Sequence, residues 1–326
     1  MTAPATKAAA PGRAAPWPLT HHAGRLVPGD QAVLPVASIA LRYGVSVFEG
    51  IRGYLHADGA VRPWLLGPHL DRLRSSCRIM DLDPACADMV PAVIGDLLAA
   101  NAVAEDCYLR VAVSAGNAGG IDEAAQSILT VSVTRAGRRR WLAADQGMRI
   151  AVSSWQRPGP AVFPSAAKNV SAYAGPRLAL AQARRGGHDT CVLLTADGMV
   201  SEAPTATVWL VEDGRMVTPR LRDAVLPGVT RAWVMAAARQ LGIDAVAEAV
   251  TPQRLKAADE VFLCGTGIEF GPVREVDGQA PAGWPAWPAG RRLVEAYFAQ
   301  ARGELPVPPV RWHPAGEAET AGATRT

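Results

Sequence analysis

Apolar and polar positions repeat with two different periods along the first half of the chain. Residues 70–80 and 89–103 carry apolar side chains at helical spacing, which predicts two amphipathic helices. Residues 127–134 alternate between apolar and polar positions as a strand does, and residues 148–155 predict another strand. Helical and strand patterns follow one another without an internal repeat, so the chain is predicted to be a mixed α/β (α+β) protein.

The second half contains turn signals that favour antiparallel strands. Asp197-Gly198 follows the apolar segment 191–195, and Asp213-Gly214 separates the strand patterns 207–211 and 216–218. Asp-Gly pairs are typical of tight turns between neighbouring strands, so we expect successive hairpins here. One more strand is predicted at residues 261–264. Helices are predicted at residues 230–241, 252–258 (with Thr251 as cap and Pro252 in the first turn) and 291–302.

The length of 326 residues and the distribution of charge predict two domains. The run Arg138-Arg139-Arg140 interrupts the apolar pattern, as a solvated connection between domains would. Both ends are rich in Pro and Ala and are expected to be tails outside the core. The predicted division is an N-terminal tail of residues 1–25, a small α/β domain of 26–134, a connection of 135–147, a large domain of 148–302 and a C-terminal tail of 303–326.

Composition excludes several classes of function. A net charge of +3 is too small for a nucleic-acid or membrane surface. The five cysteines are scattered and form no C-x-x-C pair, so neither a disulfide framework nor a metal site is expected. No apolar run of about 18 residues occurs, and no signal-peptide pattern or glycine-rich nucleotide loop is found. We therefore expect a cytoplasmic enzyme with small-molecule substrates.

Lysine is scarce, which narrows the search for amine chemistry. Only Lys7, Lys168 and Lys256 are lysines among 33 basic residues, and arginine cannot act as a neutral amine nucleophile. Lys7 lies in the predicted tail and Lys256 on a helix that looks exposed. Lys168 is surrounded by small or weakly polar residues from Pro164 to Tyr173, and burial favours the neutral amine that imine chemistry requires. Such an amine commonly holds pyridoxal phosphate.

The other parts that this cofactor needs are present in the sequence. An acidic partner for the ring nitrogen is offered by Glu202, just after the Asp197-Gly198 turn. The segment 226–231, Leu-Pro-Gly-Val-Thr-Arg, opens a helix, so the amides of Val229 and Thr230 lie where helix ends bind phosphate. A second turn with free amides and a hydroxyl, 265–267, follows the strand at 261–264. Each glycine turn alone is weak evidence, because such a turn is more often a plain loop.

Taken together, these segments resemble the class IV aminotransferases, and most of all the branched-chain amino acid aminotransferases, over residues 18–302. The motifs that carry the resemblance are Tyr43–Tyr54 (Tyr-Gly-Val-Ser-Val-Phe-Glu-Gly-Ile-Arg-Gly-Tyr), His69–Leu73, Tyr108-Leu109-Arg110, Ser153-Ser154-Trp155, Lys168 with Tyr173, Ser201-Glu202, Leu226–Thr230, Gly265–Gly267 and Pro272–Gly278. The resemblance implies pyridoxal-phosphate fold type IV. That fold is a small α/β domain plus a larger domain with a barrel-like antiparallel sheet, assembled as a homodimer or higher homo-oligomer.

The resemblance also implies a role for each residue of the cofactor site. Lys168 would be the Schiff-base lysine and the base that moves the substrate's α-proton. Glu202 would pair with the ring nitrogen, and Tyr173 would donate to the phenolate oxygen of the cofactor. The phosphate would be held by a larger set of groups: Arg72, Val229, Thr230, Gly265 and Thr266.

On the substrate side, the resemblance assigns the α-carboxylate to the turn that ends at Gly267, together with Tyr108. Arg110 would take the distal carboxylate of glutamate or 2-oxoglutarate. Arg52 is assigned to the substrate site as well, and the side-chain pocket would be lined by Tyr43, Phe48 and Tyr173.

The implied activity is transamination between an apolar, branched-chain-like L-amino acid and 2-oxoglutarate, as in branched-chain amino acid biosynthesis. Three features of this sequence depart from the family pattern and leave the identity of the substrate open. Trp141 is the only aromatic residue of the short connection. Residues 203–207 read Ala-Pro-Thr-Ala-Thr, and loop 114–120 is built of small residues. A specialised biosynthetic aminotransferase with a different amino donor is therefore an alternative. A lyase of the aminodeoxychorismate type is another, although Tyr108 and Arg110 argue against it. An inactive relative is disfavoured because Lys168 and Glu202 are both retained.

Overall fold

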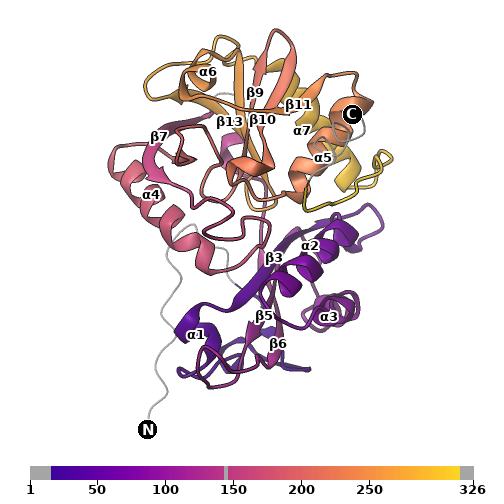
Figure 1. Cartoon of the computed structure of the whole chain (residues 1–326). Helices are drawn as coiled ribbons and strands as arrows, with labels where there is room; N and C mark the ends of the chain where they lie inside the picture. Colours follow the sequence, from indigo (N-terminus) through magenta and orange to yellow (C-terminus); the bar gives the residue numbers. More distant parts are fainter. Residues whose placement is uncertain (1–15, 143–145, 316–326) are drawn as a thin grey trace, which may run out of the picture.

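The computed structural model describes residues 16–142 and 146–315, which fold into two lobes (Figure 1). We call residues 16–135 the N-terminal lobe and residues 148–315 the C-terminal lobe. The segment 136–147 connects them and contains a short 3-10 turn, η2 (Arg140–Leu142). No helix among these described residues is both long and apolar enough to cross a membrane.

The N-terminal lobe is a six-stranded sheet with helices on one face. The strands, in the order in which they pair, are β2 (Arg25–Pro28), β1 (Leu19–His22), β6 (Ser127–Arg135), β5 (Cys107–Ala115), β3 (Ser46–Leu55) and β4 (Val61–Pro63). All neighbours in this order are antiparallel. The helices are α1 (Ile39–Tyr43), α2 (Leu66–Ile79) and α3 (Cys86–Ala100), with the short η1 (Gly29–Gln31).

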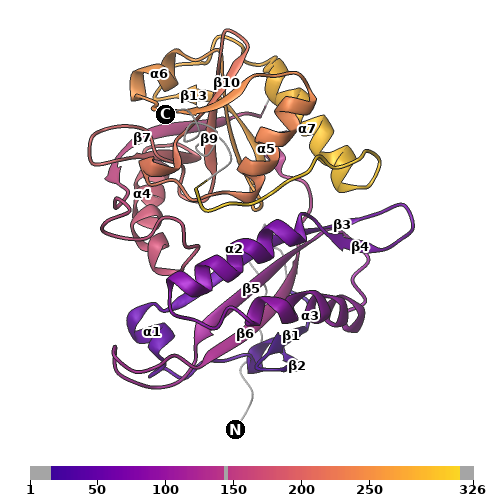
Figure 2. The ribbon, with the colours of Figure 1, turned by 45° about the vertical axis from the view of Figure 1, so that its right-hand side comes forward.

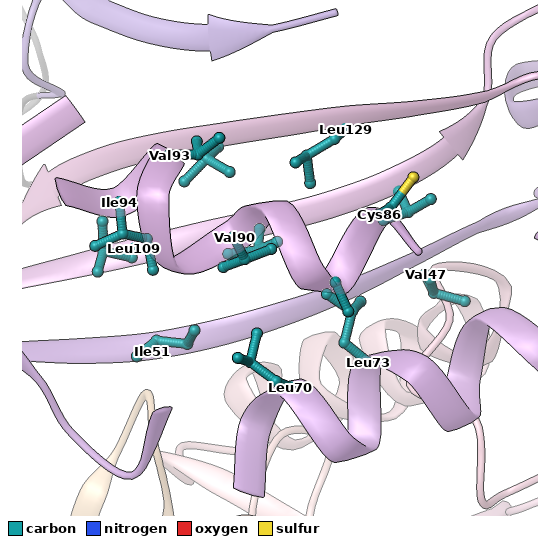
Figure 3. Close-up of a cluster of buried hydrophobic side chains, with 14 of the residues drawn as sticks. Val47, Ile51, Leu70, Leu73, Cys86, Val90, Val93, Ile94, Leu109 and Leu129 are labelled. Atoms are coloured by element: carbon teal, nitrogen blue, oxygen red, sulfur yellow. The ribbon is translucent and has the colours of Figure 1, made fainter. Parts of the chain in front are cut away.

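Alternation along the strands gives this sheet two different faces. Odd-numbered apolar residues of β3, β5 and β6 form one core with α2 and α3, and Figure 3 shows Ile51 and Leu109 on the strands facing Val90 of α3. Even-numbered residues point to the opposite side, because successive strand residues alternate between faces. Phe48, Tyr108 and Arg110 therefore share the face that the helices leave uncovered, and this face borders the C-terminal lobe.

The C-terminal lobe is built on a seven-stranded sheet. Its strands, in pairing order, are β11 (Ala245–Glu248), β10 (Arg215–Pro219), β9 (Thr207–Glu212), β12 (Glu260–Gly265), β13 (Glu269–Val276), β7 (Met148–Gln156) and β8 (Thr190–Leu194). The helices are α4 (Ala174–Arg185), α5 (Val229–Gln240), α6 (Pro252–Ala257) and α7 (Pro288–Ala301), with the short η3 (Ser171–Tyr173) and η4 (Leu221–Asp223).

This second sheet is mixed rather than antiparallel throughout. The pairs β9–β10, β9–β12 and β12–β13 are antiparallel, as expected. The pairs β10–β11, β13–β7 and β7–β8 are parallel. The predicted hairpins account for the antiparallel part of the sheet, whereas the parallel pairs join strands through long connections, on which Asp-Gly turns carry no information.

Local signals located most of the elements. The β9–β10 hairpin turns at Asp213 and Gly214, both in the left-handed region with φ of 49° and 78°, where glycine is favoured. The first predicted hairpin is also present, since backbone bonds join Leu193 to Ser201 and Glu202 around the Asp197-Gly198 turn. Thr251 caps α6 as predicted by accepting a bond from the amide of Arg254.

Both tail predictions need correction. Residues 19–28, mostly inside the predicted N-terminal tail, form β1 and β2, and β1 pairs with β6 at His21 and Val131. The C-terminal segment is irregular up to residue 315 but lies against its lobe, since the indole of Trp312 donates to the carbonyl of Pro227 at 2.8 Å. Residues 1–15 and 316–326 lie outside the described residues.

Candidate active site

A cavity of about 1060 Å³ is lined by residues of both lobes and of the connection. The helix of the N-terminal lobe nearest the other lobe is α2, as Figures 1 and 2 both show. Most of the residues proposed from the sequence line this cavity: Phe48, Arg72, Tyr108, Arg110, Lys168, Tyr173, Glu202, Val229, Thr230, Gly265, Thr266 and Gly267.

The segment that carries Lys168 is fixed by backbone bonds to the N-terminal lobe. The amide of Lys168 donates to the Ser76 hydroxyl of α2 at 3.0 Å, and its carbonyl accepts from the amide of Phe48 at 2.9 Å. The side chain is free to face the cavity, where Nζ donates to the Tyr173 hydroxyl at 2.8 Å and lies 4.7 Å from the centre of the Phe48 ring. Among the described residues, Lys168 is the only lysine that lines this cavity. It is half-buried, and contacts with both lobes position it.

Glu202 is a buried carboxylate on another wall of the cavity. It follows the Asp197-Gly198 hairpin, and only 6% of its surface is exposed. The guanidinium of Arg157 contacts Oε1 at 3.0 Å and the amide of Leu226 donates to Oε2 at 3.3 Å. Burial raises the pKa of Glu202 above its ordinary value, while Arg157 and the Leu226 amide act in the opposite direction. The carboxylate is thus well suited to hold a proton on a cationic nitrogen.

Arg72 projects from α2 into a buried ionic cluster at the cavity wall. Its Nε and Nη2 bind the two oxygens of Glu49 at 2.7 and 2.8 Å, and His69 Nδ1 lies 2.6 Å from the same carboxylate. Burial alone would raise the pKa of Glu49, but Arg72 and His69 outweigh it and lower that pKa to about 2. The remaining Nη1 donates to the carbonyl of Pro227 at 3.2 Å, which places the cation beside the start of α5.

The start of α5 has the features of an anion-binding corner. Gly228 precedes the helix, and no side-chain cap occupies the free amides of its first turn. A Cβ at Gly228 would lie 3.2 Å from the Thr207 hydroxyl, so the glycine permits a close approach of α5 to β9. Together with Arg72, the helix start provides amides, a hydroxyl on Thr230 and a fixed positive charge, which are the groups that bind a phosphate.

A second glycine turn, residues 265–267, joins β12 to β13. A Cβ at Gly265 would lie 3.3 Å from the carbonyl of Thr205, so this turn packs closely against the segment after Glu202. Thr266 and Gly267 are half-buried and line the cavity. The turn therefore brings amides and a hydroxyl into the cavity next to the Glu202 wall.

The sheet face of the N-terminal lobe forms the remaining wall. Tyr108 and Arg110 are two residues apart on β5 and point to the same side. The Arg110 guanidinium stacks on Phe48, 3.5 Å from the ring centre, and makes no ion pair among the described residues. A Cβ at Gly50 would overlap the Tyr108 hydroxyl, so this glycine lets the tyrosine lie flat on β3.

Two residues assigned to the substrate site do not line the cavity. Arg52 is fully buried and pairs with Glu269 at 2.8 Å, so it supports the wall from behind and does not reach the cavity. This corrects its assignment as a substrate ligand. Tyr43 lies at the end of α1 with 37% of its surface exposed, under the guanidinium of Arg42, and is likewise absent from the cavity wall of this chain.

Several residues of the site were not found from the sequence. Glu49 and His69 lie inside recognised motifs, and their role becomes visible only when β3 and α2 pack together. Arg157 carries no sequence signal, because it meets Glu202 through folding and is one of many arginines. Arg139 belongs to the charge run that predicts a solvated connection, yet it lines the cavity and its Nε donates to the carbonyl of Gly267 at 2.8 Å.

Comparison with known proteins agrees with this geometry. Residues 46–276 match the family described as amino-transferase class IV. The branched-chain-amino-acid aminotransferase of Salmonella typhimurium is 33% identical over 294 residues, covering 86% of this chain and 92% of the relative.

Two solved structures are similar over most of both chains. The branched-chain aminotransferase of Thermoproteus uzoniensis with norvaline has a TM-score of 0.83 at 31% identity, covering 88% of this chain and 96% of the other. The T.th. branched-chain amino acid aminotransferase complexed with N-(5'-phosphopyridoxyl)-L-glutamate has a TM-score of 0.81 at 31% identity, covering 88% and 95%. These likenesses confirm the fold class that the motifs imply. The chain belongs to the class IV aminotransferase family.

Proposed function

We propose that this aminotransferase uses pyridoxal 5'-phosphate to exchange an amino group between an apolar, branched-chain-like L-amino acid and 2-oxoglutarate. The products would be the 2-oxo acid and L-glutamate. The observation that carries the proposal is one cavity whose walls present an amine, Lys168, a buried carboxylate, Glu202, and an anion-binding corner at Arg72 and α5. The names of the relatives, and the phosphopyridoxyl-glutamate bound to one of them, support it.

The residues present fit this cofactor. Lys168 would attach to its aldehyde carbon, Glu202 would hold the proton on its ring nitrogen, and Tyr173 would donate to its phenolate oxygen. The phosphate would bind at Arg72, at the amides of Val229 and Thr230 and at the 265–267 turn. When bound, pyridoxal phosphate withdraws electrons from the substrate's α-carbon and so makes that carbon acidic.

The protein's own part in the reaction is to move a proton and to orient the substrate. A 1,3-proton shift needs one base that removes the proton from the α-carbon and returns it nearby. Lys168 would be this base, because its Nζ would be a free amine facing the substrate once the substrate has bound. Its bond to the Tyr173 hydroxyl gives Nζ a fixed partner at this stage. Arg157 would act by keeping the Glu202 carboxylate ionised despite its burial.

The substrate would be oriented by the wall opposite the anion-binding corner. The 265–267 turn and Tyr108 would take the α-carboxylate, and the stacked guanidinium of Arg110 would take the second carboxylate of glutamate. Phe48 and Tyr173, whose ring centres lie 5.1 Å apart, would contact an apolar side chain. One site would in this way accept both an apolar and an acidic substrate.

A specialised amino donor is the second candidate, and the connection supports it. Arg139, Arg140 and Trp141 line the cavity there, so two of these three side chains are cationic where an apolar substrate would favour apolar walls. A donor with an additional anionic or polar group would fit such a wall. Relative rates for leucine, valine, isoleucine and more polar amino acids decide between the two candidates.

We also propose a homodimer and a cytoplasmic location. Exposed apolar side chains surround α1 and the 117–121 loop that is hydrogen-bonded to it; they are Val33, Val36, Leu41 and Ile121. Such a patch is typical of an association surface. All five cysteines are free and buried, as in a reducing compartment. Light scattering of the purified protein tests the dimer, and a mass of one chain would contradict it.

The experiment that tests the function follows cofactor absorption while L-leucine, L-glutamate, a D-amino acid and an arylalkyl amine are offered in turn. We expect only the two L-amino acids to convert the pyridoxal form to the pyridoxamine form. Lys168→Ala should abolish the conversion. The control Lys256→Ala, which removes a partly exposed ion pair with Asp277 between two residues that do not line the cavity, should preserve it. Conversion by Lys168→Ala at the wild-type rate would contradict the assignment.

A further inference from the structure

Arg139 differs from the two arginines beside it in the connection. The Arg138 guanidinium lies over Phe298, 4.1 Å from the ring centre, and this residue does not line the cavity. Arg140 is largely exposed and reaches Asp189 at 3.5 Å. Arg139 is half-buried, lines the cavity and uses its Nε to bind the carbonyl of Gly267. Only the middle arginine of the run is therefore tied to the 265–267 turn.

The charge of Arg139 has no internal counterpart. The carboxylate in its vicinity is Glu269, and this group is already matched by the fully buried Arg52 at 2.8 Å and by the hydroxyl of Tyr54 at 2.8 Å. No carboxylate of the described residues forms an ion pair with Arg139, and its two Nη atoms make no hydrogen bond there. Burial and the nearby charge of Arg52 both lower the pKa of Arg139, whereas Glu269 raises it. The guanidiniums of Arg52 and Arg139 together with the carboxylate of Glu269 thus carry one excess positive charge.

An excess cation at a cavity wall favours an anionic ligand, since an unpaired and partly desolvated charge is costly. The turn that Arg139 holds is the one proposed for the substrate's α-carboxylate. Arg110 is another half-buried guanidinium of this cavity that lacks an ion pair among the described residues, and it projects from β5 in the other lobe. Arg184 lines the cavity and also lacks an ion pair there, but it is exposed to solvent. Two separate cations match a substrate with two carboxylates, and one of them suffices for a substrate with one.

We propose that Arg139 binds the α-carboxylate of every substrate through its Nη atoms, while its Nε fixes the turn that supplies the amides. Arg110 serves only the second carboxylate of the dicarboxylate substrates. The inference rests on the proposed aminotransferase function. It names the residue that selects substrates carrying an α-carboxylate. It also gives the arginine-rich connection a role in substrate recognition.

The test measures binding of unreactive analogues to the cofactor-loaded enzyme. The probes are 4-methylpentanoate, its uncharged relative 4-methylpentanamide, and glutarate. Arg139→Gln should weaken 4-methylpentanoate and glutarate by about tenfold or more, as expected for a lost charged hydrogen bond. It should leave the amide within about twofold, a change well below that of one such bond. Arg139→Lys should recover part of the carboxylate affinity, and the neighbouring control Arg138→Gln should match wild type.

Steady-state rates give a second measurement. Arg139→Gln should raise KM for both L-leucine and L-glutamate, with a smaller change in kcat. Equal weakening of the carboxylate and the amide would overturn the proposal, because it would mean that Arg139 only supports the turn. Unchanged carboxylate binding would overturn it too, as would a loss confined to glutarate. If wild type itself exchanged no amino groups, the proposed function would fail, whereas an active wild type with an unaffected Arg139→Gln variant would reject this inference alone.

Discussion

Key charged side chains form ion pairs on one side of the cavity and lack them on the other. On the proposed cofactor side, Arg72 forms an ion pair with Glu49 and Glu202 forms one with Arg157, and both pairs are buried. On the substrate side, Arg110 and Arg139 have no carboxylate partner among the described residues. A permanently bound group needs a rigid, prearranged site, while an exchanging substrate can bring its own counter-charge. The distribution of ion pairs therefore agrees with the proposed division of the cavity into a cofactor side and a substrate side.

The largest effect on this contrast is expected from breaking the buried pair on the cofactor side. Glu49→Gln leaves the Arg72 guanidinium buried without its partner, so the free energy of unfolding should fall by about 3–5 kcal/mol. Chemical denaturation at neutral pH measures the change. The exposed pair of Asp58 and Arg62 offers a control, and Asp58→Asn should leave the unfolding midpoint close to wild type. An equally small effect of Glu49→Gln would show that the buried cluster does not stabilise the fold.

The same carboxylate predicts a pH dependence of stability. The pKa of Glu49 is about 2 in the folded protein, below its ordinary value of 4.5, so the folded state releases this proton more easily than the unfolded chain. Its contribution is then complete above about pH 4.5 and is lost as the pH falls toward 2. Wild type should lose stability over this interval more steeply than Glu49→Gln. Parallel curves for the two proteins would contradict the assigned pKa.

The next effect concerns the substrate side. Arg110→Ala should slow the half-reaction with L-glutamate by about 10- to 100-fold, as expected when a charged hydrogen-bond donor is lost. The half-reaction with L-leucine should change far less, because leucine has no second carboxylate. Single-turnover absorption changes measure both. Equal losses for the two amino acids would show that Arg110 does not distinguish them.

The smallest effect is a shift in a pH profile. Burial raises the pKa of Glu202, and Arg157 opposes this rise, so removal of the guanidinium should move the pKa further upward. With Arg157→Gln, the acid limb of the profile of kcat/KM should therefore lie at higher pH. Arg149→Gln breaks a partly exposed pair with Glu275 outside the cavity and is the control. A limb that stays in place for Arg157→Gln would mean that Glu202 does not set it.

Sequence patterns predicted the elements whose signal is local. Helix α2 and strand β6 follow from apolar periodicity alone, and the β9–β10 hairpin follows from Asp213-Gly214. Strand β1 was missed because four residues in a Pro-rich segment gain their order from pairing with β6, more than 100 residues away. The parallel pairing of β13 with β7 was missed for the same reason, since it depends on contacts distant in the sequence.

The residues of the candidate site also divide into those with a local sequence signal and those without one. Motifs located Lys168, Glu202 and the two glycine turns, because their residue types and spacing reflect the chemistry. The partners that set the charge of these groups could not be predicted, since Arg157 becomes meaningful only at 3.0 Å from Glu202. Arg52 was misplaced because it shares the strand face of Phe48, but that end of β3 is covered by Glu269 and Tyr54.

The central claim is that Lys168 holds the cofactor in the cavity shared by the two lobes. Borohydride reduction of the cofactor-loaded protein, followed by proteolysis and mass spectrometry, tests it most directly, because reduction makes the lysine linkage permanent. We predict a pyridoxyl mark on the peptide that contains Lys168 and on no other. A mark on Lys256 or Lys7, or a cofactor that reduction fails to attach, would contradict the account.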